Sequence, residues 1–434
     1  MTEDTRPEGN GGASFWEKVK KWIQKSYSAT FPAGKTIGIF AVILVLTVLL
    51  TFSLTVNTYF KRDSEAVYRL RLLSELIENE AYFSHDSEKL MNGALSGYVN
   101  AMNDGYAVYL DQEAFERFSE KMSGVYVGIG VIFQLSTVEL AGELRQAAEI
   151  VQVTKGSTAE AAGLLVGDYV LAVVQGTETV SIDGLTENEI TSLIKGEKGT
   201  NVTLSVLRRS GNEEIVKQYT MKRASVTALS VESHVLASAE DVGVVRITGF
   251  DLQTPIQLTR TMDELIASGI QKFVIDLRNN PGGDLASVLA CASYFLEPND
   301  VVLSKESKNG DSVVYRAVKR LGSCPVSTED IGKYRGYQYV ILTNGNTASA
   351  AEILSAVFRD YSLGTLVGKT TFGKGIVQTV YALNGFGAVQ FTTSVYYPPC
   401  GVSYHGVGID PDIEVSNTET EDLQLAAALN ELKK

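Results

Sequence analysis

The chain has few of the residues that build metal centres or disulfide frameworks. Its 434 residues include three cysteines and three histidines. The cysteines are scattered, and neither a Cys-x-x-Cys nor a His-x-x-x-His spacing occurs, so we expect no metal ion and no cofactor. Cys291 falls in an apolar helical run that is typical of core packing. A disulfide between Cys324 and Cys400 stays an open alternative if the protein resides in an oxidising compartment.

The scarcity of histidine also restricts the choice of catalytic base. A Ser-His-Asp triad would need His85, His234 or His405. His85 lies in a helical stretch early in the chain, and His234 comes just after a segment of short strands. His405 follows a pair of strands and is the only competitor for a histidine-assisted mechanism.

Basic residues are outnumbered: the chain has 38 Lys and Arg against 51 Asp and Glu, a net charge of −13. Residues 1–62 hold eight basic and four acidic residues, which leaves 30 basic and 47 acidic residues for the rest of the chain. An acidic body argues against nucleic acid as a partner. The length predicts two or three domains.

One long apolar run stands out near the N-terminus. Ile37 to Val56 contains no charged residue and is long enough to cross a bilayer as a helix. Six Lys and Arg precede the run and only Lys61 and Arg62 follow it closely, so the positive-inside rule places the N-terminus in the cytoplasm. A cleaved signal peptide is the rival interpretation, but no small-x-small cleavage site follows the run. We expect a single-pass membrane protein whose catalytic part is extracytoplasmic.

Two helices are predicted just after the apolar run. Val67, Leu70, Leu73 and Ile77 recur at helical spacing, and a second helical stretch covers Ser87 to Met102. These helices either pack on the body of the same chain or join two copies in a homodimer. Both alternatives stay open.

Short strands and glycine turns follow from Gly124 onward. The Gly-Ile-Gly at 128–130 is no dinucleotide fingerprint, because no third glycine opens a helix. Together with Ala162-Gly163-Leu164 and Gly167-Asp168, it resembles a PDZ domain, a module that binds peptide C-termini. The resemblance implies a loop whose N–H groups hold the carboxylate of a peptide that pairs with the edge of the sheet. The residues of that loop are Gly128, Ile129, Gly130 and Val131.

The most informative stretch runs from Tyr339 to Thr379. An apolar strand leads through a turn into a helical run beginning at Ala350, which places Ser349 at a strand-to-helix turn. Lys374 follows within a tight glycine loop before a strand that begins at Ile376. A serine hydroxyl needs a base to become nucleophilic, and a desolvated lysine with a lowered pKa can be that base.

A second loop of the same kind lies upstream. The strand Phe273 to Arg278 runs into Asn279-Asn280-Pro281-Gly282-Gly283, and a helical stripe follows. A glycine loop between a strand and a helix points backbone N–H groups at an anion. Strands alternating with helices over 240–380 predict a layered α/β core.

Several motifs in one order resemble the carboxyl-terminal processing peptidases, also called tail-specific serine proteases. They are Phe273–Leu285, Thr347–Ile353, Thr371–Gln378 and Gly406–Asp412. The resemblance implies that Ser349 is the nucleophile and Lys374 the general base. It also implies an oxyanion hole formed by Gly282 and Gly283 together with the N–H of Ala350. A strand period of two would place Gln378 on the face of Lys374, where it would orient the lysine.

The predicted fold class is a multidomain α/β (α+β) protein with a crotonase-like layered peptidase core. The expected parts are a cytoplasmic segment (1–35), a transmembrane helix (36–58), a helical region (63–112), a PDZ domain (113–222), the peptidase core (223–418) and a C-terminal helix (419–434). The expected function is cleavage of proteins near free apolar C-termini, with the PDZ domain recruiting the tail and gating the site. A catalytically silent scaffold and a Ser/Lys amidase are the alternatives.

Overall fold

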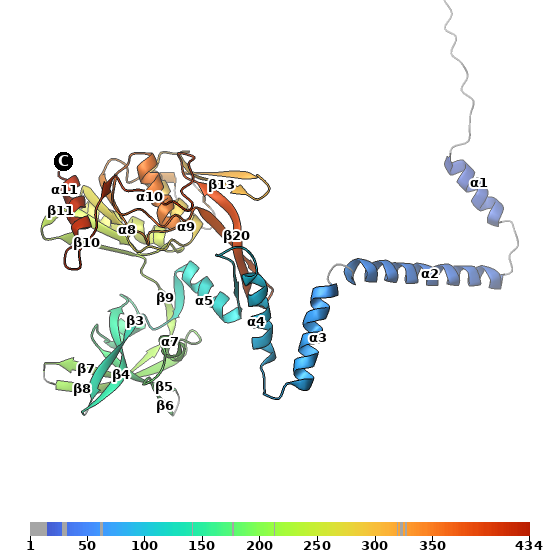
Figure 1. Ribbon diagram of the computed structural model, residues 1–434, viewed down its shortest axis with the longest axis horizontal. Coiled ribbons are helices and arrows are strands. Elements are labelled where there is room, and N and C mark those ends of the chain that lie inside the picture. Colours follow the sequence, from blue (N-terminus) through green and yellow to red (C-terminus); the bar gives the residue numbers. More distant parts are fainter. Residues whose placement is uncertain are drawn as a thin grey trace, which may run out of the picture. The chain divides into compact units, whose positions relative to one another are not determined.

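The computed structural model describes residues 15–27, 33–60, 64–140, 142–175, 178–211, 213–318, 320–321, 324–325 and 328–434. The chain divides into two compact units, Met1–Ser87 and Glu88–Lys434. Figure 1 labels the helices and strands of both units.

The described residues of the first unit form helices. They are α1 (Phe15–Tyr27), α2 (Ala33–Phe60) and α3 (Ser64–Glu80). The apolar side chains of α2 between Val42 and Leu54 are exposed, as are Val67, Leu73 and Leu76 of α3. Among the described residues no helix is both long and apolar enough to cross a membrane, so the transmembrane helix expected over 36–58 is not found there. The side chains at both ends of that expected helix lie outside the described residues.

The core of the second unit is a six-stranded sheet. Its strands, in spatial order, are β10 (Val231–Leu236), β11 (Ala239–Ile247), β12 (Lys272–Asp276), β17 (Gln338–Thr343), β18 (Thr365–Gly368) and β21 (Ile413–Glu414). From β11 to β21 all neighbours are parallel, and only β10 runs antiparallel. The predicted alternation of strands and helices is confirmed, since each parallel step needs a crossover connection.

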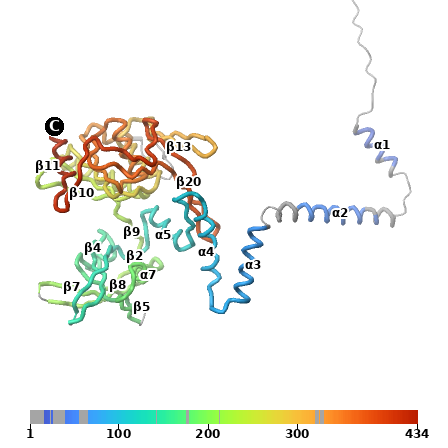
Figure 2. The backbone as a smooth tube through the Cα atoms, in the orientation of Figure 1, coloured from blue at the N-terminus to red at the C-terminus, as the bar shows by residue number. Residues whose placement is uncertain are grey.

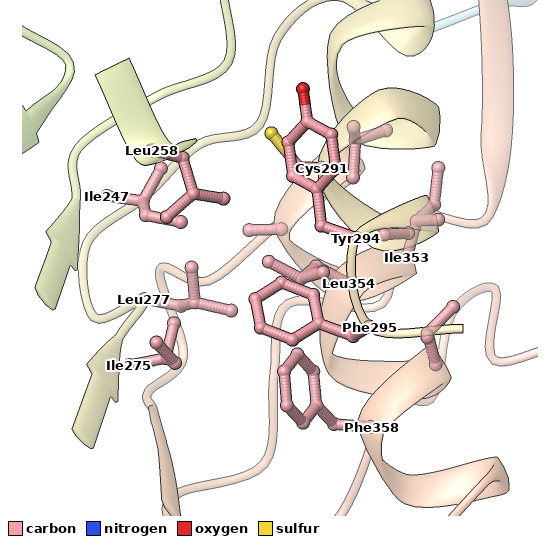
Figure 3. Packing of buried hydrophobic residues seen from close by; sticks show 14 of the residues in the cluster. Ile247, Leu258, Ile275, Leu277, Cys291, Tyr294, Phe295, Ile353, Leu354 and Phe358 are labelled. Carbon is pink, nitrogen blue, oxygen red and sulfur yellow. The ribbon is translucent and has the colours of Figure 1, made fainter. Parts of the chain in front are cut away.

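Helices cover both faces of this sheet. They are α8 (Thr254–Ala267), α9 (Leu285–Ser293) and α10 (Ala350–Asp360) on one face and α11 (Leu423–Glu431) on the other. The strands alternate between the two cores: Phe273 and Ile275 pack toward α8–α10, whereas Val274 packs toward α11. In Figure 3, Phe295 and Phe358 lie against each other in the larger core, with ring centroids 4.9 Å apart.

A second sheet stands beside this core. It contains β1 (Val108–Leu110), β20 (Ala388–Tyr397), β13 (Val301–Ser307) and β14 (Ser312–Arg316), and β19 (Ile376–Ala382) also pairs with β20. Val108 pairs with Gln390, which brings an early segment of the unit against a late one. In Figures 1 and 2, β20 extends from the layered core toward the segment that carries α4 (Ser87–Asn100). Two short strands, β15 (Arg320–Leu321) and β16 (Cys324–Pro325), pair with each other, and a 3-10 turn covers Thr328–Asp330.

Residues 125–222 form a β-rich module with its own apolar core. Its sheet has the order β3 (Val131–Leu140), β4 (Glu143–Val153), β5 (Tyr169–Gln175), β7 (Asn201–Ser210) and β8 (Glu213–Lys222), with β6 (Glu178–Ser181) paired to β5. The module also contains β2 (Val125–Gly128), which pairs with β9 (Ala224–Thr227), and the helices α6 (Thr158–Ala162) and α7 (Glu187–Ile194). The helix that precedes the module, α5 (Gln112–Ser123), was not predicted from the sequence.

Candidate active site

Ser349 occupies the predicted strand-to-helix turn. It is the residue before α10, and its backbone lies at φ 54°, ψ −116°. A positive φ is uncommon for a residue with a side chain, and such backbone strain concentrates at functional sites. The Ser349 N–H donates to Oε2 of Glu352 at 2.8 Å, which holds the turn in this conformation.

The glycine loop after β12 lies against this turn. A Cβ on Gly282 would come within 2.8 Å of both the Ala348 oxygen and the Ala350 nitrogen, so only glycine fits here. The Gly282 N–H donates to Oδ1 of the fully buried Asn280 at 2.8 Å. Gly282 therefore serves the site by letting the two loops approach closely. Its N–H is already bonded to Asn280 and is not free for an oxyanion.

Two other N–H groups remain as donors. Within the described part of the chain, the N–H groups of Gly283 and Ala350 donate to no protein acceptor. Gly283 is at φ 148°, and a Cβ on it would lie 1.9 Å from the Phe250 oxygen. Of the three predicted oxyanion residues, Gly283 and Ala350 thus have free donors and Gly282 does not.

Lys374 lies in the lysine loop, Thr371–Gly375, and not on the neighbouring strand, since β19 begins at Ile376. A register shift between Val377 and Gln378 also interrupts the pairing of β19 with β20. The period-two argument that placed Lys374 and Gln378 on one face of a strand was therefore wrong. Both residues nevertheless line one cleft, as described below.

Glu352 connects the nucleophile turn to the lysine loop. Its carboxylate is fully buried. It accepts from four groups: the Ser349 N–H, the Thr371 hydroxyl, the Gly373 N–H and the Lys374 N–H, at 2.5–2.8 Å. A buried carboxylate needs such donors to offset its lost hydration. This role was not predicted from the sequence, although Glu352 follows a helix-capping serine by three residues, which is the spacing of a capping box.

Lys374 is half-buried. Burial lowers the pKa of Lys374 below 10.5, its ordinary value, while the charges of Asp104 and Glu352 oppose the shift. The Nζ atom lies 4.6 Å from the centroid of the Tyr106 ring. A lowered pKa is what a lysine needs to act as a base near neutrality.

A cleft of about 390 Å³ brings the predicted catalytic residues together. Its walls include Gly282, Gly283, Ser349, Ala350, Lys374, Gln378 and Tyr396. The Gln378 amide donates to the Thr392 hydroxyl at 3.4 Å and not to Lys374. The cleft holds groups able to supply a nucleophile, a base and two oxyanion donors.

Tyr396 is a cleft residue that sequence reasoning missed. Its hydroxyl donates to the Lys374 carbonyl at 2.5 Å and accepts from the Tyr404 hydroxyl at 2.9 Å. Burial raises the pKa of Tyr396, and hydrogen bonds with Tyr404 and Ser349 oppose the rise. The hydroxyl therefore stays protonated and contacts both the nucleophile and the backbone of the lysine loop. No periodicity pointed to it, because it lies on an ordinary alternating strand.

The predicted peptide-binding loop lies in the β-rich module, and none of its residues lines the cleft with Ser349. Ile129 is buried, and its carbonyl accepts from the Ala159 N–H at 3.0 Å. The Gly130 carbonyl accepts from the Thr154 N–H at 2.8 Å. The loop opens into β3, which is an edge strand of its sheet.

The competing histidine His405 does not line the cleft of Ser349. His405 is exposed, and its Nδ1 accepts from the Gly375 N–H at 3.3 Å. The bridge left open between Cys324 and Cys400 is not formed: Cys324 is buried, Cys400 is exposed, and both are free thiols.

The model for "Peptidase family S41" matches residues 241–415. The chain is 33% identical over 347 residues to the carboxy-terminal processing protease CtpA of Bacillus subtilis (strain 168), covering 80% of this chain and 68% of that protein. The chain belongs to peptidase family S41. As an S41 protein of the carboxyl-terminal processing type, it is a serine-type peptidase.

Other similarities extend beyond the S41 match. The chain is 30% identical over 396 residues to a "Probable CtpA-like serine protease" of Staphylococcus aureus (strain COL), covering 89% of this chain and 74% of that protein. Residues 55–114 match the "Activating protease CtpB N-terminal domain".

Two solved structures are also similar to this S41 peptidase. One is the photosystem II D1 C-terminal processing protease, at 23% identity over 79% of this chain and 86% of that one, with a TM-score of 0.42. The other is a PDZ domain of the carboxy-terminal protease from Vibrio cholerae in complex with peptide. It is 25% identical and covers 24% of this chain and 97% of that one, with a TM-score of 0.21. Membership of family S41 rests on the sequence relatives.

Proposed function

We propose that this S41 peptidase is an endopeptidase that cleaves proteins near free apolar C-termini by a Ser349/Lys374 mechanism. The observation that carries the proposal is the shared cleft, which is lined by Ser349, by Lys374 with its lowered pKa, and by Gly283 and Ala350. A silent scaffold would not need these catalytic groups. An amidase acting on small substrates would not need a peptide-binding module of the PDZ kind.

Acylation begins when neutral Lys374 takes the proton from the Ser349 hydroxyl. The Ser349 oxygen attacks the scissile carbonyl carbon, and the carbonyl oxygen becomes an oxyanion that accepts from Gly283 and Ala350. Protonated Lys374 then gives its proton to the departing amine, and the C–N bond breaks to leave an ester on Ser349.

Deacylation uses the same base. Lys374 takes a proton from a water molecule, which attacks the ester carbonyl and releases the new carboxyl terminus. The proton on Lys374 returns to the Ser349 oxygen. Gln378 lines the same cleft, and its role is to orient the lysine amine during these transfers.

We also propose that the β-rich module is a PDZ domain that binds the substrate tail. The supporting observation is that β3 lies at the edge of its sheet, where an extended peptide can add as a further strand. The N–H groups of Gly128–Val131, which lead into β3, would hold the terminal carboxylate.

One ion pair is the proposed gate between this module and the active site. Lys195, at the end of α7, contacts Glu120 of α5 at 2.6 Å. Both line a cavity of about 450 Å³ that also reaches Gly282 and Gly283. We propose that this contact closes the path from the module to Ser349 until a tail binds.

Location and assembly are further proposals. The charge-free run of α2 exposes its apolar side chains between Val42 and Leu54, which supports a membrane-associated N-terminus with the peptidase outside the cytoplasm. The exposed apolar residues of α3, including Val67 and Leu73, support a homodimer. Protease accessibility of the peptidase in intact cells tests the proposed location. Sedimentation equilibrium in detergent tests the proposed homodimer.

The mechanism is tested with the full-length protein and an unstructured substrate that ends in small apolar residues. Cleavage should be lost in Ser349→Ala and Lys374→Ala, but kept in Lys369→Ala, because Lys369 contacts Glu414 outside the cleft. Amidation of the substrate C-terminus should slow cleavage. Cleavage that survives Ser349→Ala would contradict the proposed mechanism, and indifference to amidation would contradict tail recognition.

A further inference from the structure

The segment before β1 forms a wall beside the catalytic lysine. Tyr106 presents its ring to the Lys374 amine at 4.6 Å from the ring centroid. The pairing of Val108 with Gln390 anchors this segment to β20, which also pairs with the strand that follows the lysine loop. The ring is therefore held in place by the sheet. An aromatic ring face stabilises a cation at this separation.

Asp104 supplies a charge from the same segment. Its Oδ2 accepts from the Thr392 N–H at 2.7 Å, and its Oδ1 accepts from the Thr392 hydroxyl at 3.1 Å and the Tyr106 N–H at 3.0 Å. Slight burial acts to raise the pKa of Asp104, but these hydrogen bonds and the charge of Lys374 hold it below the usual value. Asp104 is thus ionised at neutral pH.

The same residues reach Gln378. The Thr392 hydroxyl that donates to Asp104 also accepts from the Gln378 amide at 3.4 Å. One chain of contacts therefore runs from Asp104 through Thr392 to a residue of the catalytic cleft.

We propose that Asp104 and Tyr106 are positioning residues for the S41 reaction: the Tyr106 ring holds the Lys374 amine beside the cleft, and the Asp104 carboxylate, fixed by Thr392 and the Tyr106 N–H, brings a negative charge to the same wall. The inference rests on the proposed role of Lys374 as general base. It adds a part of the chain that precedes every catalytic motif found in the sequence.

Other groups also face Lys374, and they determine which variants are informative. They are Glu352 from α10, the Tyr396 hydroxyl from β20 and His405, which accepts from the adjacent Gly375 N–H. Glu352 also opposes the lowering of the lysine pKa, but it binds the backbone of both loops and cannot be changed without moving them. Asp104 does not line the cleft, so its charge can be removed without replacing a cleft residue.

The first test is the pH profile of kcat/KM for Asp104→Asn. Loss of the negative charge lowers the pKa of Lys374, so more of the lysine is neutral at a given pH. The acidic limb of the kcat/KM profile should move to lower pH. At pH values below the wild-type midpoint, kcat/KM divided by its plateau value should be at least about twice as large in the variant as in wild type. Asp104→Glu should keep the wild-type midpoint. An unchanged midpoint in Asp104→Asn would overturn the role of the charge.

The second test compares two changes at Tyr106. Tyr106→Leu removes the ring that positions the amine and should lower the high-pH plateau of kcat, where Lys374 is already neutral, about tenfold or more with little change in KM. Tyr106→Phe keeps the ring and should stay within about twofold of wild type. Equal losses in both variants would overturn the role of the ring. This pair also tests the inference if Asp104→Asn does not fold.

A direct titration separates this inference from the proposed mechanism. In the Ser349→Ala protein, lysines labelled with ¹³C at Cε are titrated by NMR, and Lys374 is assigned with Lys374→Arg. The midpoint should lie below 10.5 and fall further when Asp104→Asn is added. Equal midpoints would overturn the inference even if Lys374 is the base. If the midpoint falls as expected but cleavage survives Lys374→Ala, the proposed mechanism is overturned instead.

Discussion

The backbone N–H groups of Ser349 and Lys374 donate to the same oxygen, Oε2 of Glu352, each at 2.8 Å. The nucleophile and the base belong to different loops, and this one buried atom fixes the distance between their backbones. The other carboxylate oxygen holds Thr371 and Gly373 of the lysine loop. Glu352 thus positions the two catalytic loops and does not itself line the cleft.

Replacing Glu352 with Gln should therefore impair catalysis without touching the reacting groups. An amide offers one acceptor oxygen, and its NH₂ group would face N–H donors, so the two loops shift apart. Because a misplacement of about 1 Å can cost about 100-fold, kcat should fall by about that factor with a small change in KM. Circular dichroism checks that the variant is folded. Wild-type kcat in folded Glu352→Gln would contradict this account.

Gly283→Ala should remove an oxyanion donor. The new Cβ would lie 1.9 Å from the Phe250 oxygen, so the loop must move and its N–H with it. Loss of one such donor lowers kcat about 100- to 1,000-fold. Gly345→Ala is the matched control, since a Cβ there meets nothing within 4 Å. Steady-state kinetics on one peptide substrate compare the two, and similar rates would argue against Gly283 as a donor.

The pH dependence of cleavage should follow Lys374. The neutral amine is the active form, so the rate rises with pH through the lysine pKa and falls about tenfold per pH unit below it. Burial lowers that pKa, which places the midpoint below 10.5. Single-turnover rates across a pH series measure the midpoint. A rate that does not change with pH below 10.5 would be incompatible with a lysine base.

Glu120→Gln should raise cleavage in the absence of a bound tail. It removes the ion pair with Lys195, in which both side chains are about one-third exposed (35% and 34%). Such pairs contribute about 0.2–1 kcal/mol, so basal cleavage should rise by up to about fivefold. Exchanging the two charges, Glu120→Lys with Lys195→Glu, should restore the basal rate. Unchanged basal cleavage in Glu120→Gln would exclude this contact as the gate.

The larger apolar core should be sensitive to truncation of Phe358. The ring is fully buried against Phe295 and Tyr339. Phe358→Ala should lower the free energy of unfolding by about 3–5 kcal/mol, while Phe386→Ala, whose side chain is 73% exposed, should change it by less than about 0.5 kcal/mol. Urea unfolding measures both. Equal destabilisation by the two changes would contradict the burial pattern.

The sequence predicted the parts of the site that reside in local patterns. Ser349 at a strand-to-helix turn and the glycines after β12 follow from hydrophobic periodicity and turn residues, and the structure places both as expected. The lysine was found through its glycine neighbours. Its place in the loop before Ile376 was predicted correctly, but extending the strand's period of two to Lys374 was wrong because periodicity holds only within the strand.

The missing parts depend on contacts between distant segments. Nothing near Asp104 or Tyr106 indicates that β1 pairs with β20 and brings them to Lys374. The engagement of the Gly282 N–H by Asn280 is likewise a matter of side-chain geometry. Motifs identify residues, and tertiary pairing decides which of their atoms are free to react.

The pairing of β1 with β20 has a consequence for how this peptidase is made. Val108 and Gln390 lie far apart in the chain, and the cleft needs segments from both regions as well as the parallel pairing of β12 with β17. Contacts of such sequence separation form late and slowly. A growing polypeptide on the ribosome therefore has no working cleft, and the newly synthesised protease cannot digest its surroundings before its chain has been translated past β20.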